Sequence, residues 1–183
     1  MQTISTLTLH GKFLHLKYLH ISLNRGVAIS PSYDYLSLVS FLVAAPCLET
    51  FIFDVRQRDM KHDSIIGDSS QLRQLPEHRY NNLKSVVISG FCSAKSLVEL
   101  TCHIIENASS LESLTLHTTK GCDRCSDDNP GVCAPMGRNI IKEAHRALVA
   151  IRTHIEGIIP SRVKFIVVEP CIRCHAVENQ MSS

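Results

Sequence analysis

Several features are scarce in this sequence of 183 residues, and each shortage excludes a class of protein. With only 8 glycines and 7 prolines, the chain is neither collagen-like nor of low complexity. Charge of one sign is not in excess, because 19 basic residues face 17 acidic ones. A net charge of +2 gives no electrostatic reason to expect nucleic acid or an acidic membrane as partner. The P-loop, G-x-G-x-x-G, G-x-S-x-G and H-E-x-x-H motifs are absent from the sequence.

Long hydrophobic runs are missing as well. The longest apolar stretch, 36–48, has 13 residues and contains Ser37, Ser40 and Pro46, whereas a membrane span needs about 20 residues. The first residues, MQTISTLTLHGK, do not show a basic segment followed by an apolar one, so we expect no cleaved signal. Eight cysteines are too few for a disulfide scaffold. We therefore expect reduced thiols in an intracellular protein, in the cytoplasm or nucleus.

What the chain does contain is a repeated six-residue frame with apolar residues at positions one, four and six. Positions four and six alternate with polar residues, which is the period of a strand with one buried face. Position two is Lys or Glu in five of the six copies. The copies are Ile4-Leu7-Leu9, Leu16-Leu19-Ile21, Leu48-Phe51-Phe53, Leu83-Val86-Ile88, Leu111-Leu114-Leu116 and Val163-Ile166-Val168.

Helical patterns lie between several of these copies. In 94–108, apolar residues recur at steps of 3, 4 and 4, and in 139–156 they recur at steps of 3, 4, 3 and 4. Gly157 is the expected C-cap of the second helix. A shorter apolar helix is predicted over 35–45. Strands that alternate with helices predict a parallel sheet with right-handed crossovers.

The frame L-x-x-L-x-L is the signature of the leucine-rich repeat, whose ninth position is Asn or Cys. Asn24 and Cys171 occupy that position in their copies. We predict an α/β leucine-rich-repeat solenoid, with a curved parallel sheet and helices on the convex side. The copies begin 12, 32, 35, 28 and 52 residues apart, so the array is irregular and its first repeat is truncated. The predicted domain covers 1–175, with an insertion loop at 119–138 and a flexible tail at 176–183.

Positions three, five and seven of each copy are predicted to form the concave face of the sheet. Lys and Arg are absent from this predicted set, so it does not suit a nucleic-acid groove, which needs clustered cations. Small polar residues with some exposed apolar ones suit a protein partner, although an unused sheet face stays an alternative. The set is Tyr18, His20 and Ser22; Thr50, Ile52 and Asp54; Ser85, Val87 and Ser89; Ser113, Thr115 and His117; and Phe165, Val167 and Glu169.

Long blocks of the chain resemble plant F-box/LRR proteins of the meiotic-F-box-like group. The resemblance extends from about Phe13 to His175 and is strongest in four blocks: FLHLKYLHISL, SYDYLSLVSFLVAAPCLETFIFDV, LKSVVISGFCSAKSLVELTCHIIENASSLESLTL and EAHRALVAIRTHIEGIIPSRVKFIVVEPCIRCH. It implies the repeat region that recognises the target of a cullin-based ubiquitin ligase. In that family, the F-box itself holds the Skp-type adaptor.

The sequence contains no F-box. The stretch that begins at Leu75-Pro76 is polar over 77–82 and then continues into a predicted strand. We therefore expect a fragment or truncated product that holds the C-terminal repeat region, in which adaptor binding is doubtful. The predicted function is protein interaction with an unidentified substrate, without catalysis, cofactor, nucleic acid or membrane.

Cysteine spacing leaves a second possibility open. Cys122-x-x-Cys125 and Cys171-x-x-Cys174 could supply four thiolates to a zinc ion in a small zinc-stabilised intracellular binding domain. The gap of 45 residues between the pairs exceeds the usual 15–20. The prediction is therefore no bound metal, with Cys171 as a ladder residue that makes a hydrogen bond to a neighbouring turn.

Catalytic patterns are weak. Cys102-His103 and Cys174-His175 are neighbours in sequence, but a nucleophile and its base must meet in space. His145 and His154 are predicted on the polar face of the last helix. No enzymatic activity is predicted.

Overall fold

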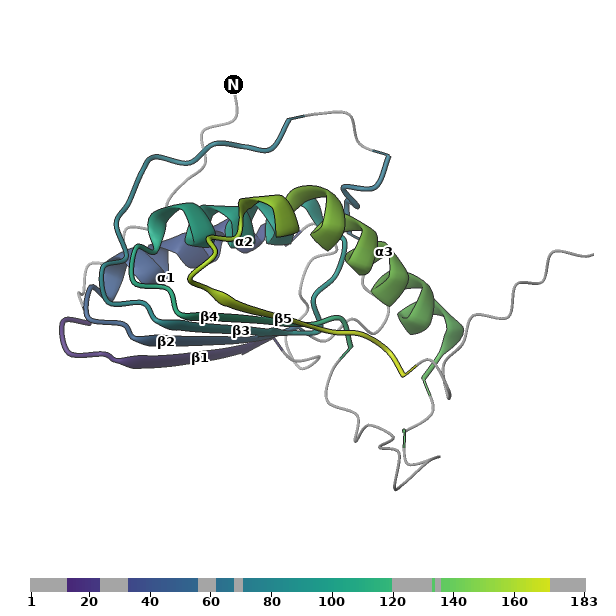
Figure 1. Cartoon of the computed structure of the whole chain (residues 1–183), viewed down its shortest axis with the longest axis horizontal. Helices are drawn as coiled ribbons and strands as arrows, with labels where there is room; N and C mark the ends of the chain where they lie inside the picture. Colours follow the sequence, from purple (N-terminus) through teal and green to yellow (C-terminus); the bar gives the residue numbers. More distant parts are fainter. Residues whose placement is uncertain are drawn as a thin grey trace, which may run out of the picture.

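The computed structural model describes residues 13–23, 33–55, 62–67, 71–119, 133 and 136–171. Within them the chain forms five strands, three α-helices and two short 3₁₀ helices (Figure 1). The elements are β1 (Tyr18–Leu23), η1 (Tyr35–Leu38), α1 (Val39–Ala44), β2 (Thr50–Val55), β3 (Ser85–Ser89), α2 (Lys95–Asn107), β4 (Ser113–His117), α3 (Arg138–His154), η2 (Glu156–Ile158) and β5 (Lys164–Val168).

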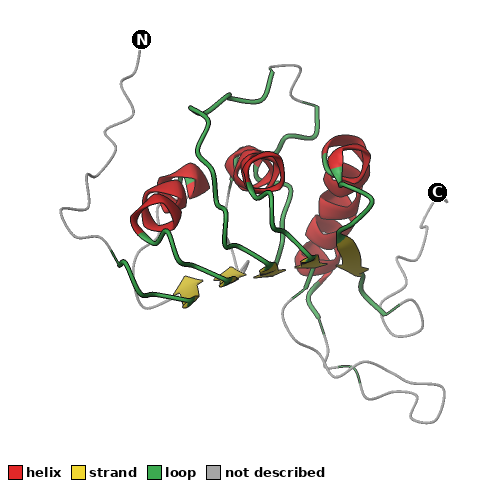
Figure 2. Cartoon of the chain, turned by 60° about the vertical axis from the view of Figure 1, so that its left-hand side comes forward, coloured by secondary structure: helices red, strands yellow, loops and turns green. Residues whose placement is uncertain are grey.

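The strands form one parallel sheet in the order β1-β2-β3-β4-β5, so each strand pairs with its neighbours in sequence. All three helices lie on the same side of this sheet (Figure 2). A parallel pair requires a crossover, and a right-handed crossover places each connection on the same face. The result is a two-layer α/β arrangement with one sheet face packed on helices. In the described residues, no helix is both long and apolar enough to cross a membrane.

The predicted frame sets the register of the first four strands. Leu19 pairs with Phe51, Phe51 with Val86, and Val86 with Leu114, so position four of each copy forms one row across the sheet. The same holds for position six. The helices confirm their predictions closely, since α2 runs from Lys95 to Asn107 and α3 from Arg138 to His154. The cap of α3 is Ile155 rather than Gly157, because the chain continues into η2.

Position two of the frame has a structural role. The carbonyl of Lys17 accepts hydrogen bonds from the backbone N–H groups of Glu49 and Thr50, and the carbonyl of Glu49 accepts from Lys84 and Ser85 in the same way. These bonds extend the ladder to the turn before each strand. The side chains alternate in charge, and Glu49 is 2.9 Å from Lys17 and 3.3 Å from Lys84. Because these ion pairs are exposed, each contributes little to the free energy of folding.

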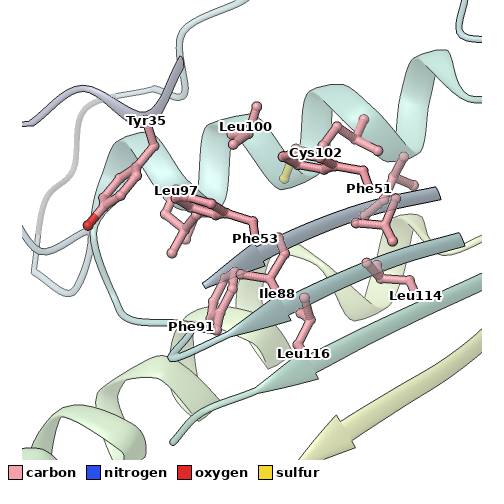
Figure 3. Packing of buried hydrophobic residues seen from close by; sticks show 14 of the residues in the cluster. Tyr35, Phe51, Phe53, Ile88, Phe91, Leu97, Leu100, Cys102, Leu114 and Leu116 are labelled. Atoms are coloured by element: carbon pink, nitrogen blue, oxygen red, sulfur yellow. The ribbon is translucent and has the colours of Figure 1, made fainter. Parts of the chain in front are cut away.

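The core lies between the sheet and the helices (Figure 3). Phe51, Phe53, Ile88 and Leu114 from the central strands are fully buried against helix residues such as Leu97. Each side chain of this size contributes roughly 1.5–3 kcal/mol when it is removed from water. The rings of Phe51 and Phe53 stack with centroids 6.2 Å apart. The shared core explains why no single strand–helix unit is sufficient by itself.

Gly90 ends β3 in a conformation that requires glycine. Its φ is +73°, and a Cβ at this position would collide with the carbonyl of Val55 on the neighbouring strand. Glycine permits both the left-handed turn and the close backbone approach. The chain can therefore leave the sheet here and enter α2.

The connection from β2 to β3 contains no helix in its described parts, 62–67 and 71–84. Arg73 fixes this connection to the helical layer. Its Nε donates to Oε2 of Glu99 on α2 over 2.8 Å, and one terminal nitrogen lies 2.7 Å from Oδ2 of Asp34. The Glu99 side chain is completely buried, so the guanidinium compensates a charge that would otherwise be costly.

The last strand corrects one prediction. The frame places Ile166 and Val168 on the buried face, but β5 pairs Leu114 with Phe165 and Leu116 with Val167. Phe165 and Val167 pack against the core, while Ile166 is 37% exposed. Apolar residues occupy five of the six positions in VKFIVV and give no clear alternation, so the sequence of this copy does not determine which face is buried.

Several sequence-based predictions lie outside the described residues. They include the first copy of the frame, Ile4-Leu7-Leu9, the ladder residue Asn24, most of the insertion loop at 119–138, and the tail at 176–183. The domain limits of 1–175 stay a prediction.

Candidate functional site: the open face of the sheet

The face of the sheet opposite the helices is the predicted interaction surface, and we call it the open face. No described helix lies on it (Figure 2). The strand register arranges its fifteen side chains in three rows. The first row is Tyr18, Thr50, Ser85, Ser113 and Lys164; the middle row is His20, Ile52, Val87, Thr115 and Ile166; and the last row is Ser22, Asp54, Ser89, His117 and Val168.

Each row has a distinct chemistry. Hydroxyl groups dominate the first row, and Ser113 Oγ donates to Ser85 Oγ over 3.1 Å between neighbouring strands. The middle row carries β-branched side chains at four of its five positions, and three of them are aliphatic. Most of these side chains are half-buried by their neighbours, whereas Tyr18 and Ile166 at the two ends are 55% and 37% exposed. The face therefore offers an apolar strip that is bordered by hydrogen-bonding groups.

Charge on the open face is sparse. His20 Nε2 lies 2.9 Å from Asp54 Oδ2, which places an imidazole–carboxylate contact between β1 and β2. The corrected register of β5 removes Phe165, Val167 and Glu169 from the predicted face and adds Lys164, Ile166 and Val168. Lys164 is then the one Lys or Arg among the fifteen positions. A single cation cannot neutralise a row of phosphates, so the face is unsuited to nucleic acid.

The buried Cys102-His103 pair does not have the geometry of a nucleophile and its base. Burial raises the pKa of the Cys102 thiol to about 12, and Sγ lies 3.7 Å from the carbonyl of His154. His103 instead contacts Tyr80 Oη through Nε2 at 3.0 Å and Asn107 Nδ2 through Nδ1 at 3.3 Å. Burial, with the nearby His78, lowers the pKa of His103. A thiol that burial keeps protonated is a poor nucleophile.

A groove of about 980 Å³ lies between 71–81 and the helical layer, away from the open face. Cys102, His103 and Glu106 of α2 line one side, and Arg79 lines the other. His154 also borders this groove and is half-buried, while His145 is exposed as predicted. The lining combines side chains of both charges with two histidines and a thiol whose pKa is raised by burial.

The possible zinc ligands Cys122, Cys125 and Cys174 lie outside the described residues, as does the Cys174-His175 pair. Cys171 is described and half-buried. The role of Cys171 as a ladder residue stays a prediction. The absence of a bound metal also stays a prediction.

Sequence reasoning missed two groups of side chains that come together across long distances. Arg73 meets Glu99 and Asp34, and His62 meets Glu143. Their separations of 26 to 81 residues leave no local spacing pattern. Glu99 follows Leu97 by two residues and so lies on the polar side of the predicted helix, where no sequence pattern signals its burial.

Comparison with known protein families gives a match over most of the chain. The family model described as "At1g61320/AtMIF1, LRR domain" matches residues 1–172. Neither the curated proteins nor the solved structures contain a match to the chain. The matched region includes all five strands and all three helices.

Proposed function

Because this chain belongs to the leucine-rich-repeat domain family of At1g61320/AtMIF1, we propose that its open face binds a protein partner. The arrangement of the three rows is the observation that carries the proposal. An apolar middle row with hydroxyl-bearing residues beside it resembles the composition of protein interfaces, which combine apolar contacts with hydrogen bonds. Its low charge favours a partner surface that is itself largely uncharged.

The finer proposal is a role in the recognition of ubiquitin-ligase substrates, as in F-box/LRR proteins. The support is the similarity of the four sequence blocks to the repeat regions of those proteins. The same similarity implies a curved solenoid with its helices on the convex side, inside the cell. Since these 183 residues contain no F-box, we propose that they do not bind a Skp-type adaptor.

We also propose that the chain has no catalysis of its own. The raised pKa of Cys102 and the contacts of both ring nitrogens of His103 with Tyr80 and Asn107 support this proposal. A thiol-reactive activity probe should therefore label the folded chain no faster than it labels an ordinary buried cysteine. Rapid labelling at Cys102 would contradict the proposal.

The experiment is affinity purification with quantitative mass spectrometry on three versions of the chain. Val87→Asp introduces a charge in the middle row of the open face. Val149→Asp introduces the same charge on α3, where Val149 is 49% exposed and lies away from the open face. Circular dichroism serves as the control that both variants retain the fold.

The proposal predicts a set of proteins that the native chain and Val149→Asp capture and that Val87→Asp loses at least tenfold. Adaptor and cullin should be absent from this set. Equal capture by all three versions would contradict binding through the open face. Direct binding of the purified adaptor to residues 1–183 would contradict the proposal on the missing F-box.

A further inference from the structure

Three potential metal ligands from separate segments meet at the start of α2. His62 comes from the β2–β3 connection, Cys92 from the β3–α2 turn, and Glu143 from α3. Their ligand atoms all lie within 4.8 Å of one another. His62 Nε2 is 3.0 Å from Glu143 Oε1, and the Cys92 residue is 1% exposed. The side chains of His62 and Glu143 are 12% and 14% exposed, so solvent reaches the cluster from their side.

The backbone and nearby hydroxyl groups hold this cluster in place. Ser93 N–H donates to Glu143 Oε1 over 2.7 Å, which fixes the carboxylate beside the β3–α2 turn. Ser93 Oγ lies 2.7 Å from Ser64 Oγ and 3.3 Å from His62 Nε2. A second layer of hydrogen bonds that orients the ligands is typical of metal sites.

An unsatisfied hydroxyl group provides an independent observation. Tyr35 is 1% exposed, and its Oη has no hydrogen-bond partner. Burial raises the pKa of the phenol, and the Cys92 thiol beside it raises that pKa further by charge and by a weak side-chain interaction that falls short of hydrogen-bond geometry. Figure 3 shows the phenol oxygen next to the loop that leads from Phe91 to α2. A thiol is only a weak acceptor, whereas a metal-bound thiolate accepts strongly. The Tyr35 hydroxyl would therefore gain a strong acceptor when Cys92 binds a metal.

We propose that His62, Cys92 and Glu143 bind a zinc ion, with the Tyr35 hydroxyl donating to the Cys92 sulfur. Imidazole nitrogen, thiolate and carboxylate are the three ligand types that zinc accepts in proteins, at about 2.0–2.3 Å. Coordination would draw the most distant pair of ligand atoms together by roughly 1 Å from their present separation. The proton of the Cys92 thiol would pass to solvent when the sulfur binds, and the proton on His62 Nε2, which now faces Glu143 Oε1, would move to Nδ1 so that neutral imidazole binds the ion. A water molecule completes the tetrahedron.

The ion would connect three parts of the chain that are distant in sequence. It would tie the β2–β3 connection, which has no helix of its own in the described residues, to α3 and to the start of α2. This site is distinct from the set Cys122, Cys125, Cys171 and Cys174. It does not depend on the proposed binding of a protein by the open face.

The test is zinc binding by the full chain after chelation, measured by equilibrium dialysis and metal analysis. A background variant with Ser in place of Cys122, Cys125, Cys171 and Cys174 separates the two possible sites. The comparison within this background is Cys92→Ser against Cys102→Ser. Both cysteines are buried, but Cys102 lies outside the cluster. Cobalt(II) provides a spectroscopic signal, because a bound thiolate gives a charge-transfer band in the near ultraviolet.

The background variant should bind one zinc ion, and zinc should raise its thermal midpoint. Cys102→Ser should retain the ion, while Cys92→Ser and His62→Gln should lose both the ion and the charge-transfer band. Tyr35→Phe should weaken zinc binding by about tenfold. If the background variant binds no zinc, or if Cys92→Ser retains it, the cluster is an ion pair only and the proposal is wrong. Folded His62→Gln provides the decisive comparison if Cys92→Ser does not fold.

Discussion

Leu114 and Thr115 are neighbours in β4, but their side chains lie on opposite faces of the sheet. Leu114 is completely buried beneath the helices, while Thr115 lies in the middle row of the open face. The alternation along one strand therefore determines whether a substitution affects the core or the surface.

A pair of matched substitutions tests this assignment. Leu114→Asp should abolish folding, because it buries a charge without a partner and costs more than the roughly 2–5 kcal/mol of a Leu→Ala change. Thr115→Asp should lower the free energy of unfolding by about 1 kcal/mol or less. Urea denaturation measures both. Equal midpoints for the two variants would show that the strand register is wrong.

His103 makes stability depend on pH. Burial lowers its pKa in the folded chain, so the unfolded chain binds a proton at a higher pH than the folded chain does. The stabilisation from the neutral imidazole is complete above the unfolded pKa of about 6.5 and is lost as pH falls through the folded pKa. His103 changes the free energy of unfolding by at most about 1.4 kcal/mol per pH unit.

Unfolding free energies at pH 7.5, 6.5 and 5.5 test this prediction. The native chain should lose stability as the pH falls, and His103→Gln should reduce that loss. His145→Gln is the control, since His145 is exposed on α3 and should leave the dependence unchanged. An equal effect of the two substitutions would rule out the buried imidazole as the cause.

At the scale of elements, the sequence predicts strands and helices well wherever polar and apolar residues alternate clearly. LKSVVI and LESLTL each place one set of apolar side chains at the buried positions, so β3 and β4 have the predicted register. VKFIVV does not, because almost every position is apolar and a shift of one residue exchanges two hydrophobic faces. The pairing of β5 with β4 is therefore a tertiary property that this segment alone cannot determine.

The same limit applies to the β2–β3 connection. No periodic pattern predicts its path, because the contacts that hold it come from Arg73 to Glu99 and Asp34. The open face was predictable for four strands, since it follows directly from the alternation. The cluster of His62, Cys92 and Glu143 was not, since its members are separated by 30 or more residues.

Two substitutions in β5 distinguish the observed register from the one that the frame predicts. Phe165→Ala should lower the free energy of unfolding by about 2 kcal/mol, because the ring packs against the core while remaining half-buried. Ile166→Ala should cost less than about 1 kcal/mol, because Ile166 is 37% exposed on the open face. Denaturation curves that reverse this order would favour the frame of the sequence.

At the scale of the whole molecule, the two faces of the sheet have different roles. One face is covered by helices and supplies the core. The other combines an apolar middle row with hydroxyl groups and a single lysine, Lys164, which is why we assign it to a protein partner. Membership in a leucine-rich-repeat domain family agrees with this division, because a repeated strand–helix unit leaves one sheet face uncovered along the array.

The most direct test of the account is site-specific photo-crosslinking in cells from which the chain captures its partner. A photoreactive amino acid is placed at Thr115, in the centre of the open face, or at Val149, which is exposed on α3. Binding through the open face predicts a covalent adduct with the captured protein from position 115 and none from position 149. An adduct that forms from position 149 but not from position 115 would contradict binding through the open face.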